Sequence, residues 1–197
     1  LPLTRFAQQV EAATGHCFED YAALHAWSVE EAEDFWRAAW SFLELQGEPG
    51  DTVIDDRHQM PGASWFPEGR VSFAGTILRE ANDRPAIRAR GEHQTQWRTI
   101  TRRELHEMVG AAAEAMRQAG VVEGDRVVGY LPNIPETIVA MLAASTLGAI
   151  WSSCSPDFGV RGVLDRFERL DPKLLVCCDG YALSLIHISE PTRLCRI

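Results

Sequence analysis

Lysine is almost absent from this chain of 197 residues. The sequence has 19 basic residues, and Lys173 is the only lysine among them. Chemistry that depends on a lysine, such as Schiff-base formation, therefore has a single candidate.

Long apolar runs and paired cysteines are also missing. No stretch reaches the roughly 18 apolar residues of a membrane span, and the chain does not open with a basic region followed by an apolar one. The five cysteines show no CxxC spacing, and Cys177 and Cys178 are adjacent, where a disulfide is sterically unfavourable. We therefore expect no membrane partner, no secretory signal and a cytoplasmic location.

The motifs of several enzyme classes do not occur. The sequence lacks GxGxxG, GxxxxGK[ST], GxSxG and HExxH, which excludes a dinucleotide fingerprint, a P-loop, a nucleophile elbow and a zinc protease. The six histidines are scattered and form no cluster with cysteine at ligand spacing. We assign no catalytic residue and no metal ligand.

The net charge of −9 is concentrated in residues 1–60, which hold 12 Asp and Glu against three Arg. The rest of the chain is balanced. Nucleic-acid binding needs a basic surface, so no nucleic-acid partner is expected.

Three short apolar runs organise the second half of the chain. They are Arg126–Tyr130, Ile150–Ser153 and Leu174–Cys178, and helical segments at 136–147 and 160–170 separate them. None of the runs alternates polar with apolar residues, so we expect strands that are buried on both faces. Strands separated by helices predict an α/β fold with a parallel βαβαβ sheet.

A helical extension over residues 1–60 is expected before this sheet. Residues 3–14 have helical spacing, and Ser28 with Glu31 has the pattern of a capping box that opens a helix through Leu45. A further helix is predicted over 71–81.

A β-hairpin and a long helix should connect this extension to the sheet. The expected strands are Pro85–Arg90 and Gln96–Ile100. Thr101 and Glu104 then form a second capping box, and the helix that follows should end at Gly120.

The candidate site lies where the predicted strands end. In an open parallel sheet, ligands bind beyond the carboxyl ends of the strands, which here lead into loops 131–135 and 154–159. The second loop precedes a helix N-terminus and offers Ser155, Asp157, Phe158 and Gly159 to an anion or a nucleotide phosphate. The alternative is that Ser155 or Asp157 only caps the helix.

Four stretches of the sequence resemble a known family. They are YAALHAWSVEEAEDFW (residues 21–36), WFPEGRVSFAGTIL (65–78), TITRRELHEMV (99–109) and the segment 124–167, which contains WSSCSPDFG. Together they resemble the N-terminal part of acyl-CoA synthetases of the adenylate-forming superfamily. The WSSCSPDFG segment is most similar to that of the acetoacetyl-CoA synthetases.

The resemblance implies an ATP-dependent acid–thiol ligase that uses CoA and Mg²⁺ and joins acetoacetate to CoA through an acyl-adenylate. Residues 61–181 would be the first part of the AMP-binding domain, and the candidate loop would lie on the CoA or nucleotide side. The phosphate loop and catalytic lysine of the family have no counterpart here, and Lys173 matches neither. We therefore expect an inactive N-terminal fragment that binds no cofactor by itself.

The segment Ala182–Ile197 departs from the family pattern. It contains SLIHISEPTR, which resembles sequence produced by adapter read-through, so we expect a foreign tail. Two other functions stay open: a fragment of an acetate- or propionate-type synthetase, and a non-catalytic α/β module that binds a nucleotide or a protein.

Overall fold

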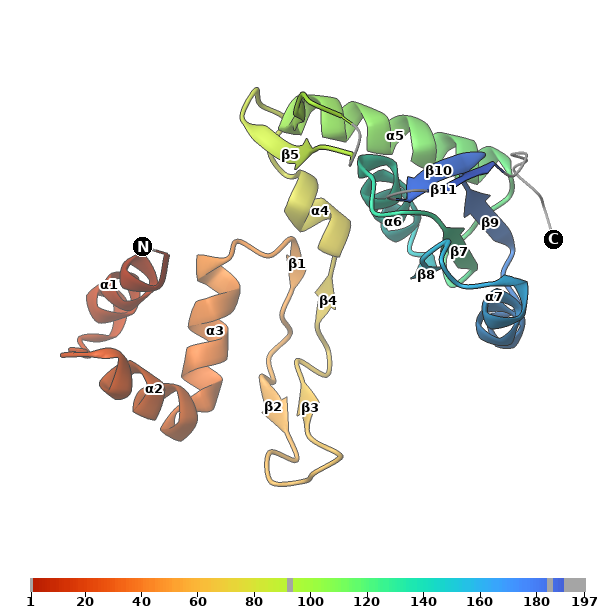
Figure 1. Cartoon of the computed structure of the whole chain (residues 1–197). Helices are drawn as coiled ribbons and strands as arrows, with labels where there is room; N and C mark the ends of the chain where they lie inside the picture. Colours follow the sequence, from red (N-terminus) through yellow and green to blue (C-terminus); the bar gives the residue numbers. More distant parts are fainter. Residues whose placement is uncertain (1, 92–93, 184–185, 190–197) are drawn as a thin grey trace. The chain divides into compact units, whose positions relative to one another are not determined.

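The computed structural model describes residues 2–91, 94–183 and 186–189 (Figure 1). It divides into two compact units, one running to Thr76 and the other beginning at Ile77. Residues 61–76, which the sequence places with the AMP-binding domain, thus lie in the first unit. Among the described residues, no helix is long and apolar enough to cross a membrane.

Three helices form the core of the first unit: α1 (Pro2–Thr14), α2 (Tyr21–Glu30) and α3 (Ala32–Phe42). Phe6 and Val10 of α1 pack with Leu24 and Trp27 of α2, and aromatic side chains of α3 cover this cluster. Of the predicted helical extension over residues 1–60, the part up to Phe42 is helical, and residues 43–60 contain only short strands.

The predicted capping box at Ser28 is wrong. Helix α2 begins at Tyr21, and the carboxylate of its N-cap residue Asp20 accepts a hydrogen bond from the Ala23 N–H. Ser28 lies inside α2, where its hydroxyl donates to the carbonyl of His25 at 2.7 Å. Glu31 separates α2 from α3 and does not belong to a helix that starts at Ser28.

The rest of the first unit consists of short antiparallel strand pairs. Strand β1 (Gly47–Glu48) pairs with β4 (Arg70–Val71), and β2 (Ile54–Asp55) pairs with β3 (Ser64–Trp65). The ring of Trp65 in β3 lies edge to face against that of Trp36 in α3, with 5.3 Å between the ring centroids, and this contact fixes β3 to the helix. Helix α4 covers only Phe73–Leu78, shorter than predicted.

The second unit opens with the predicted hairpin. Strands β5 (Pro85–Ala89) and β6 (Arg98–Thr101) are antiparallel, and α5 (Arg102–Gln118) follows directly. The capping box of Thr101 and Glu104 is confirmed. Gly120 follows the helix with a φ of 88°, a left-handed conformation that glycine adopts without strain.

A parallel three-stranded sheet forms the centre of this unit, as predicted (Figure 1). Its strands are β7 (Arg126–Tyr130), β8 (Ile150–Cys154) and β9 (Leu174–Cys177), in the spatial order β8-β7-β9. Helix α6 (Pro135–Thr146) connects β7 to β8, and α7 (Val160–Phe167) with a short 3₁₀ turn (Glu168–Leu170) connects β8 to β9.

Only the central strand is buried on both faces. Val127 and Val128 of β7 are fully buried, whereas Ile150 at the start of β8 is 54% exposed. The expectation that all three strands are buried on both faces is wrong for β8, which has two exposed residues, and holds only in part for β9, which has one buried and three half-buried residues; both are edge strands of the described sheet.

The two faces of β7 pack against different helices. Successive side chains of a strand point to opposite faces. Val128 forms a cluster with Cys154 and with Phe167 of α7, so Val127 faces the other side, where α6 contacts the sheet. Helix α6 exposes little apart from its ends, in agreement with its almost uniformly apolar sequence.

After the sheet, β10 (Gly180–Leu183) and β11 (Ile186–Ser189) form an antiparallel pair. Much of the predicted foreign tail, residues 184–185 and 190–197, lies outside the described residues. The origin of this segment stays a prediction.

Candidate functional site

The candidate loops lie at one edge of the parallel sheet. Tyr130 and Cys154 form the last residue pair between β7 and β8, so both strands end side by side. The Leu131 N–H donates to the Cys154 carbonyl at 3.3 Å, which holds the starts of the two loops together. The topology thus brings together the two loops that the sequence singled out.

Ser155 organises the second loop through local hydrogen bonds. Its hydroxyl donates to Oδ2 of Asp157 at 2.7 Å, and the Asp157 N–H lies 3.3 Å from the same hydroxyl. The Phe158 N–H donates to the Ser155 carbonyl at 3.2 Å. These contacts close a tight turn.

Neither Ser155 nor Asp157 caps the helix that follows. Gly159, and neither of these residues, is the N-cap of α7, and as a glycine it has no side chain to accept a hydrogen bond from the first turn. The alternative interpretation of the SPDFG sequence as a helix cap is therefore wrong. The first N–H groups of a helix have no acceptor within the helix, so the start of α7 is suited to an anion.

Two side chains outside the loop fix its conformation. The Tyr130 hydroxyl lies 2.8 Å from the carbonyl oxygen of Pro156 and 3.0 Å from that of Phe158. The guanidinium of Arg166 lies over the Phe158 ring, 4.3 Å from its centroid. The role of Tyr130 was not predicted from the sequence, because 26 residues separate it from Pro156.

Cys154 is a packing residue at the end of β8. Burial is the main cause that raises the pKa of its thiol, and the nearby Arg166 opposes this only in part. The thiol therefore stays protonated near neutral pH, which makes it a poor nucleophile. Its neighbours Val128 and Phe167 are apolar.

The first loop contributes backbone structure and no reactive side chain. The Thr137 hydroxyl donates to the Pro132 carbonyl at 2.7 Å, and Pro135 occupies the first turn of α6. The hydrogen bond and the proline together fix the start of α6.

Lys173 lies at the opposite end of the sheet from the candidate loop. Its side-chain ammonium donates to Oδ2 of Asp125 at 2.7 Å, and its backbone N–H donates to the carbonyl of Arg126, the first residue of β7. The hydrogen bond from Lys173, supported by the Val122 N–H, lowers the pKa of Asp125. This lysine connects two chain segments and is remote from the loop at residues 155–159.

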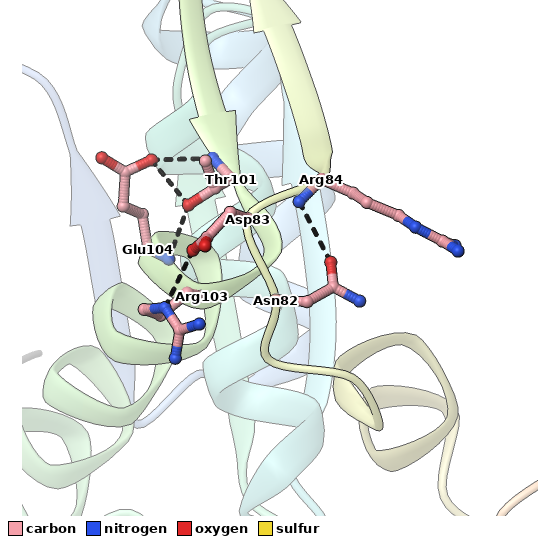
Figure 2. Close-up of polar contacts among 6 residues, drawn as sticks. All are labelled: Asn82, Asp83, Arg84, Thr101, Arg103 and Glu104. Atoms are coloured by element: carbon pink, nitrogen blue, oxygen red, sulfur yellow. Dashed lines mark hydrogen bonds and ion pairs between the residues drawn. The ribbon is translucent and has the colours of Figure 1, made fainter.

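A larger polar cluster joins the hairpin to α5 (Figure 2). Glu104 accepts hydrogen bonds from the backbone and hydroxyl of Thr101, which lower its pKa. Arg103 pairs with Asp83 at 3.0 Å, and Asn82 accepts from the Arg84 N–H at 3.1 Å. These contacts fix a turn and the start of α5 and join the segment before β5 to that helix, so the role of the cluster is structural.

No metal site is apparent in the part of the chain that the structure describes, where no three His, Cys, Asp or Glu side chains are grouped to hold an ion. An apolar cavity of about 400 Å³ lies among α5, α6 and β9. Its walls are mainly Ala, Val, Leu and Met side chains, which provide no acid, base or nucleophile apart from Glu136. Glu136 is itself paired with Arg98 at 2.6 Å.

Two family models match consecutive parts of the chain. The model described as acetyl-coenzyme A synthetase N-terminus covers residues 21–74, and the model described as AMP-binding enzyme covers residues 76–194. The boundary between them falls beside the division of the structure between Thr76 and Ile77.

Similar proteins extend across both parts. Acetoacetyl-coenzyme A synthetase of Rhizobium meliloti (strain 1021) is 44% identical over 180 residues, which are 91% of this chain and 28% of that protein. The enzyme of Macaca fascicularis is 44% identical over 176 residues, covering 88% of this chain and 26% of its own length. The chain thus spans little more than a quarter of these relatives.

A solved structure gives the same result. Acetoacetyl-CoA synthetase from Streptomyces lividans superimposes with a TM-score of 0.88 at 40% identity, over 95% of this chain and 30% of that one. The chain has homologues among the acetoacetyl-CoA synthetases, and, because the AMP-binding match covers more than half of it, the chain belongs to the AMP-binding enzyme family.

Proposed function

We propose that this chain is the N-terminal part of an ATP-dependent acetoacetate–CoA ligase that acts in the cytoplasm. The observation that carries the proposal is the 44% identity to an acetoacetyl-coenzyme A synthetase over 91% of the chain. This similarity includes both units and the candidate loop, so it is not confined to a shared nucleotide-binding core.

The proposed reaction has two steps. The carboxylate of acetoacetate attacks the α-phosphorus of ATP, which forms the acyl-adenylate and releases pyrophosphate. The sulfur of CoA then attacks the acyl carbon, and AMP leaves. In such a ligase the βαβαβ arrangement would form one end of the larger sheet of the AMP-binding domain.

The candidate loop would contribute to binding a phosphate-bearing cosubstrate. We assign this contact to Ser155, Asp157, Phe158 and Gly159, on the CoA or nucleotide side of the full-length enzyme. The support is the position of the loop beyond the carboxyl end of β8 and the start of α7 at Gly159, where the first N–H groups of the helix suit an anion. The Asp157 carboxylate is held by Ser155 inside the turn.

The described residues do not fit a Mg²⁺ site, since they contain no suitable group of acidic or histidine side chains. The proposal therefore gives no role in metal binding to this part of the protein. With its one lysine engaged by Asp125, the 197-residue chain alone is expected to form no acyl-CoA.

The test is a substrate comparison with a full-length protein that contains this sequence. With ATP, Mg²⁺ and CoA present, AMP and acyl-CoA formation is measured for acetoacetate, acetate and propionate. We expect kcat/KM for acetoacetate to exceed that for the other acids by about tenfold or more. A preference for acetate or propionate would instead support the other class of synthetase.

A second measurement addresses the non-catalytic alternative. ATP is titrated calorimetrically into the 197-residue chain. We expect no heat of binding at micromolar ATP, because the phosphate loop of the family has no counterpart in this chain and a helix N-terminus alone binds phosphate weakly. Micromolar affinity would favour a self-sufficient nucleotide-binding module.

A further inference from the structure

We propose that Tyr130 is a positioning residue that sets the direction of the backbone amides in the loop 155–159. This inference rests on the proposed function, in which the loop contacts a phosphate-bearing cosubstrate. The residue itself lies at the end of the central strand β7 and belongs to neither of the candidate loops.

The first argument is the geometry of the hydroxyl. A tyrosine hydroxyl carries a single proton, yet two carbonyl oxygens lie within hydrogen-bond distance, that of Pro156 at 2.8 Å and that of Phe158 at 3.0 Å. One phenol therefore attracts two carbonyls of the same turn.

The second argument concerns the amides on the other side of these peptide bonds. A trans peptide is planar, so its C=O and N–H point in opposite directions. With the Phe158 carbonyl turned toward Tyr130, the N–H of Gly159 must point away from the phenol. Gly159 is the N-cap residue of α7 and has no side chain that could accept a hydrogen bond from the amides of the first turn.

The third argument is the rigidity of the support. The Tyr130 ring packs against the buried cluster of Val128, Cys154 and Phe167, so its hydroxyl is carried by the core of the sheet. The loop itself is a five-residue connection with an exposed surface, and Phe158 is 38% exposed. Tyr130 thus connects the exposed turn to the rigid core, and a turn held in one conformation is preorganised for binding.

The test compares Tyr130→Phe with Tyr21→Phe in the full-length ligase. Both changes remove one hydroxyl, but Tyr21 lies on α2 in the first unit and is 67% exposed. KM is measured separately for ATP, CoA and the acid, together with kcat and the melting temperature. Hydrogen exchange of the peptide that covers residues 154–162 is followed in the same proteins.

We expect Tyr130→Phe to raise KM for either ATP or CoA by roughly two- to tenfold, the range for loss of one hydrogen bond, with kcat and the other KM values kept. Loop amides should exchange several-fold faster, and Tyr21→Phe should change nothing. The cosubstrate whose KM rises identifies the ligand of the loop.

Two results would overturn the inference. One is an unchanged KM for both cosubstrates with unchanged exchange of the loop. The other is a parallel loss of kcat, all KM values and melting temperature, which indicates a structural role alone. If the enzyme prefers acetate or propionate, the acetoacetate proposal fails, while the KM values for ATP and CoA still decide the role of Tyr130.

Discussion

Replacing Gly129 by alanine should destabilise the second unit through one defined steric contact. A Cβ atom at this position would lie 2.6 Å from Cη2 and Cζ2 of the Trp151 ring. Carbon atoms pack at about 3.5 to 4.0 Å, so the ring would have to retreat by about 1 Å. Gly129 has no positive φ, and alanine is compatible with its backbone.

The magnitude follows from two opposing effects. Overpacking in a well-packed region costs about 1–3 kcal/mol. Alanine in place of glycine stabilises by about 0.5–1 kcal/mol, since it restricts the unfolded chain. Because Trp151 is only half-buried on an edge strand and its ring can move, we expect a net loss of about 1 kcal/mol in the free energy of unfolding.

Gly110 provides a matched control for this change. It lies on the exposed face of α5, and a Cβ atom there would meet nothing within 4 Å. Gly110→Ala should therefore stabilise by about 0.5–1 kcal/mol, the helix-propensity difference. The gap between the two variants, about 1.5–2 kcal/mol by these estimates, then reports the collision with Trp151.

The assay is urea unfolding followed by far-UV circular dichroism. With a slope of about 2 kcal/mol per molar urea, the two midpoints should differ by almost 1 M. Gly129→Ala is also placed in a Trp151→Leu background, where the collision is removed and the penalty should disappear. The reasoning is refuted if Gly129→Ala stabilises as Gly110→Ala does, or if the penalty persists without the indole ring.

Three further changes test other parts of the fold. Thr101→Ala should cost about 1 kcal/mol in urea unfolding, because the hydroxyl accepts the Glu104 N–H at the helix start. Leu142→Ala should cost about 3–5 kcal/mol, since this side chain of α6 is 1% exposed. The pKa of Asp125 is lower in the folded protein than its ordinary value of 3.8. Its pairing with Lys173 therefore stabilises the fold above pH 3.8, and this stabilisation is lost as the pH falls through the folded-state pKa. Asp125→Asn should remove this contribution to the loss of stability in acid.

Each of these changes has a contrary result. An unchanged urea midpoint for Thr101→Ala would mean that the capping box contributes nothing, and a loss below about 1 kcal/mol for Leu142→Ala would mean that the core around α6 collapses into the space. For Asp125→Asn, midpoints measured from pH 7 to pH 3 that keep the wild-type slope would exclude this carboxylate as a source of acid sensitivity.

Much of the second unit could be predicted because its signals are local. Strand β7 occupies the predicted residues, and the capping box of Thr101 and Glu104 needs only a three-residue spacing. A capping pattern is not sufficient by itself, as Ser28 shows. There the helix starts earlier at the Asp20 cap, and the packing of Leu24 and Trp27 in the helical core keeps the Ser28 region inside α2.

The exposure of β8 could not be predicted from its residues. Its apolar run is similar to that of β7, but β7 lies between two strands, whereas β8, like β9, lies at an edge of the described sheet. Spatial order depends on long-range pairing, which a local pattern does not encode. The position of the candidate loop could be predicted because parallel strands end at a common edge of the sheet. The contact of Tyr130 with Pro156 could not, because 26 residues separate them.

Adjacent residues of the central strand serve opposite faces of the sheet. Gly129 lies on the face where the Trp151 ring crosses the strand, and its missing side chain makes room for that ring. Tyr130 points to the other face, with Val128 and α7, and there its hydroxyl holds the loop. Since the two contacts share no atoms and lie on different faces, their effects should separate: Gly129→Ala acts on stability through Trp151, and Tyr130→Phe acts on the loop with little effect on the core. The end of β7 therefore combines a packing requirement with a positioning one, and the sequence pair Gly-Tyr satisfies both because strand side chains alternate.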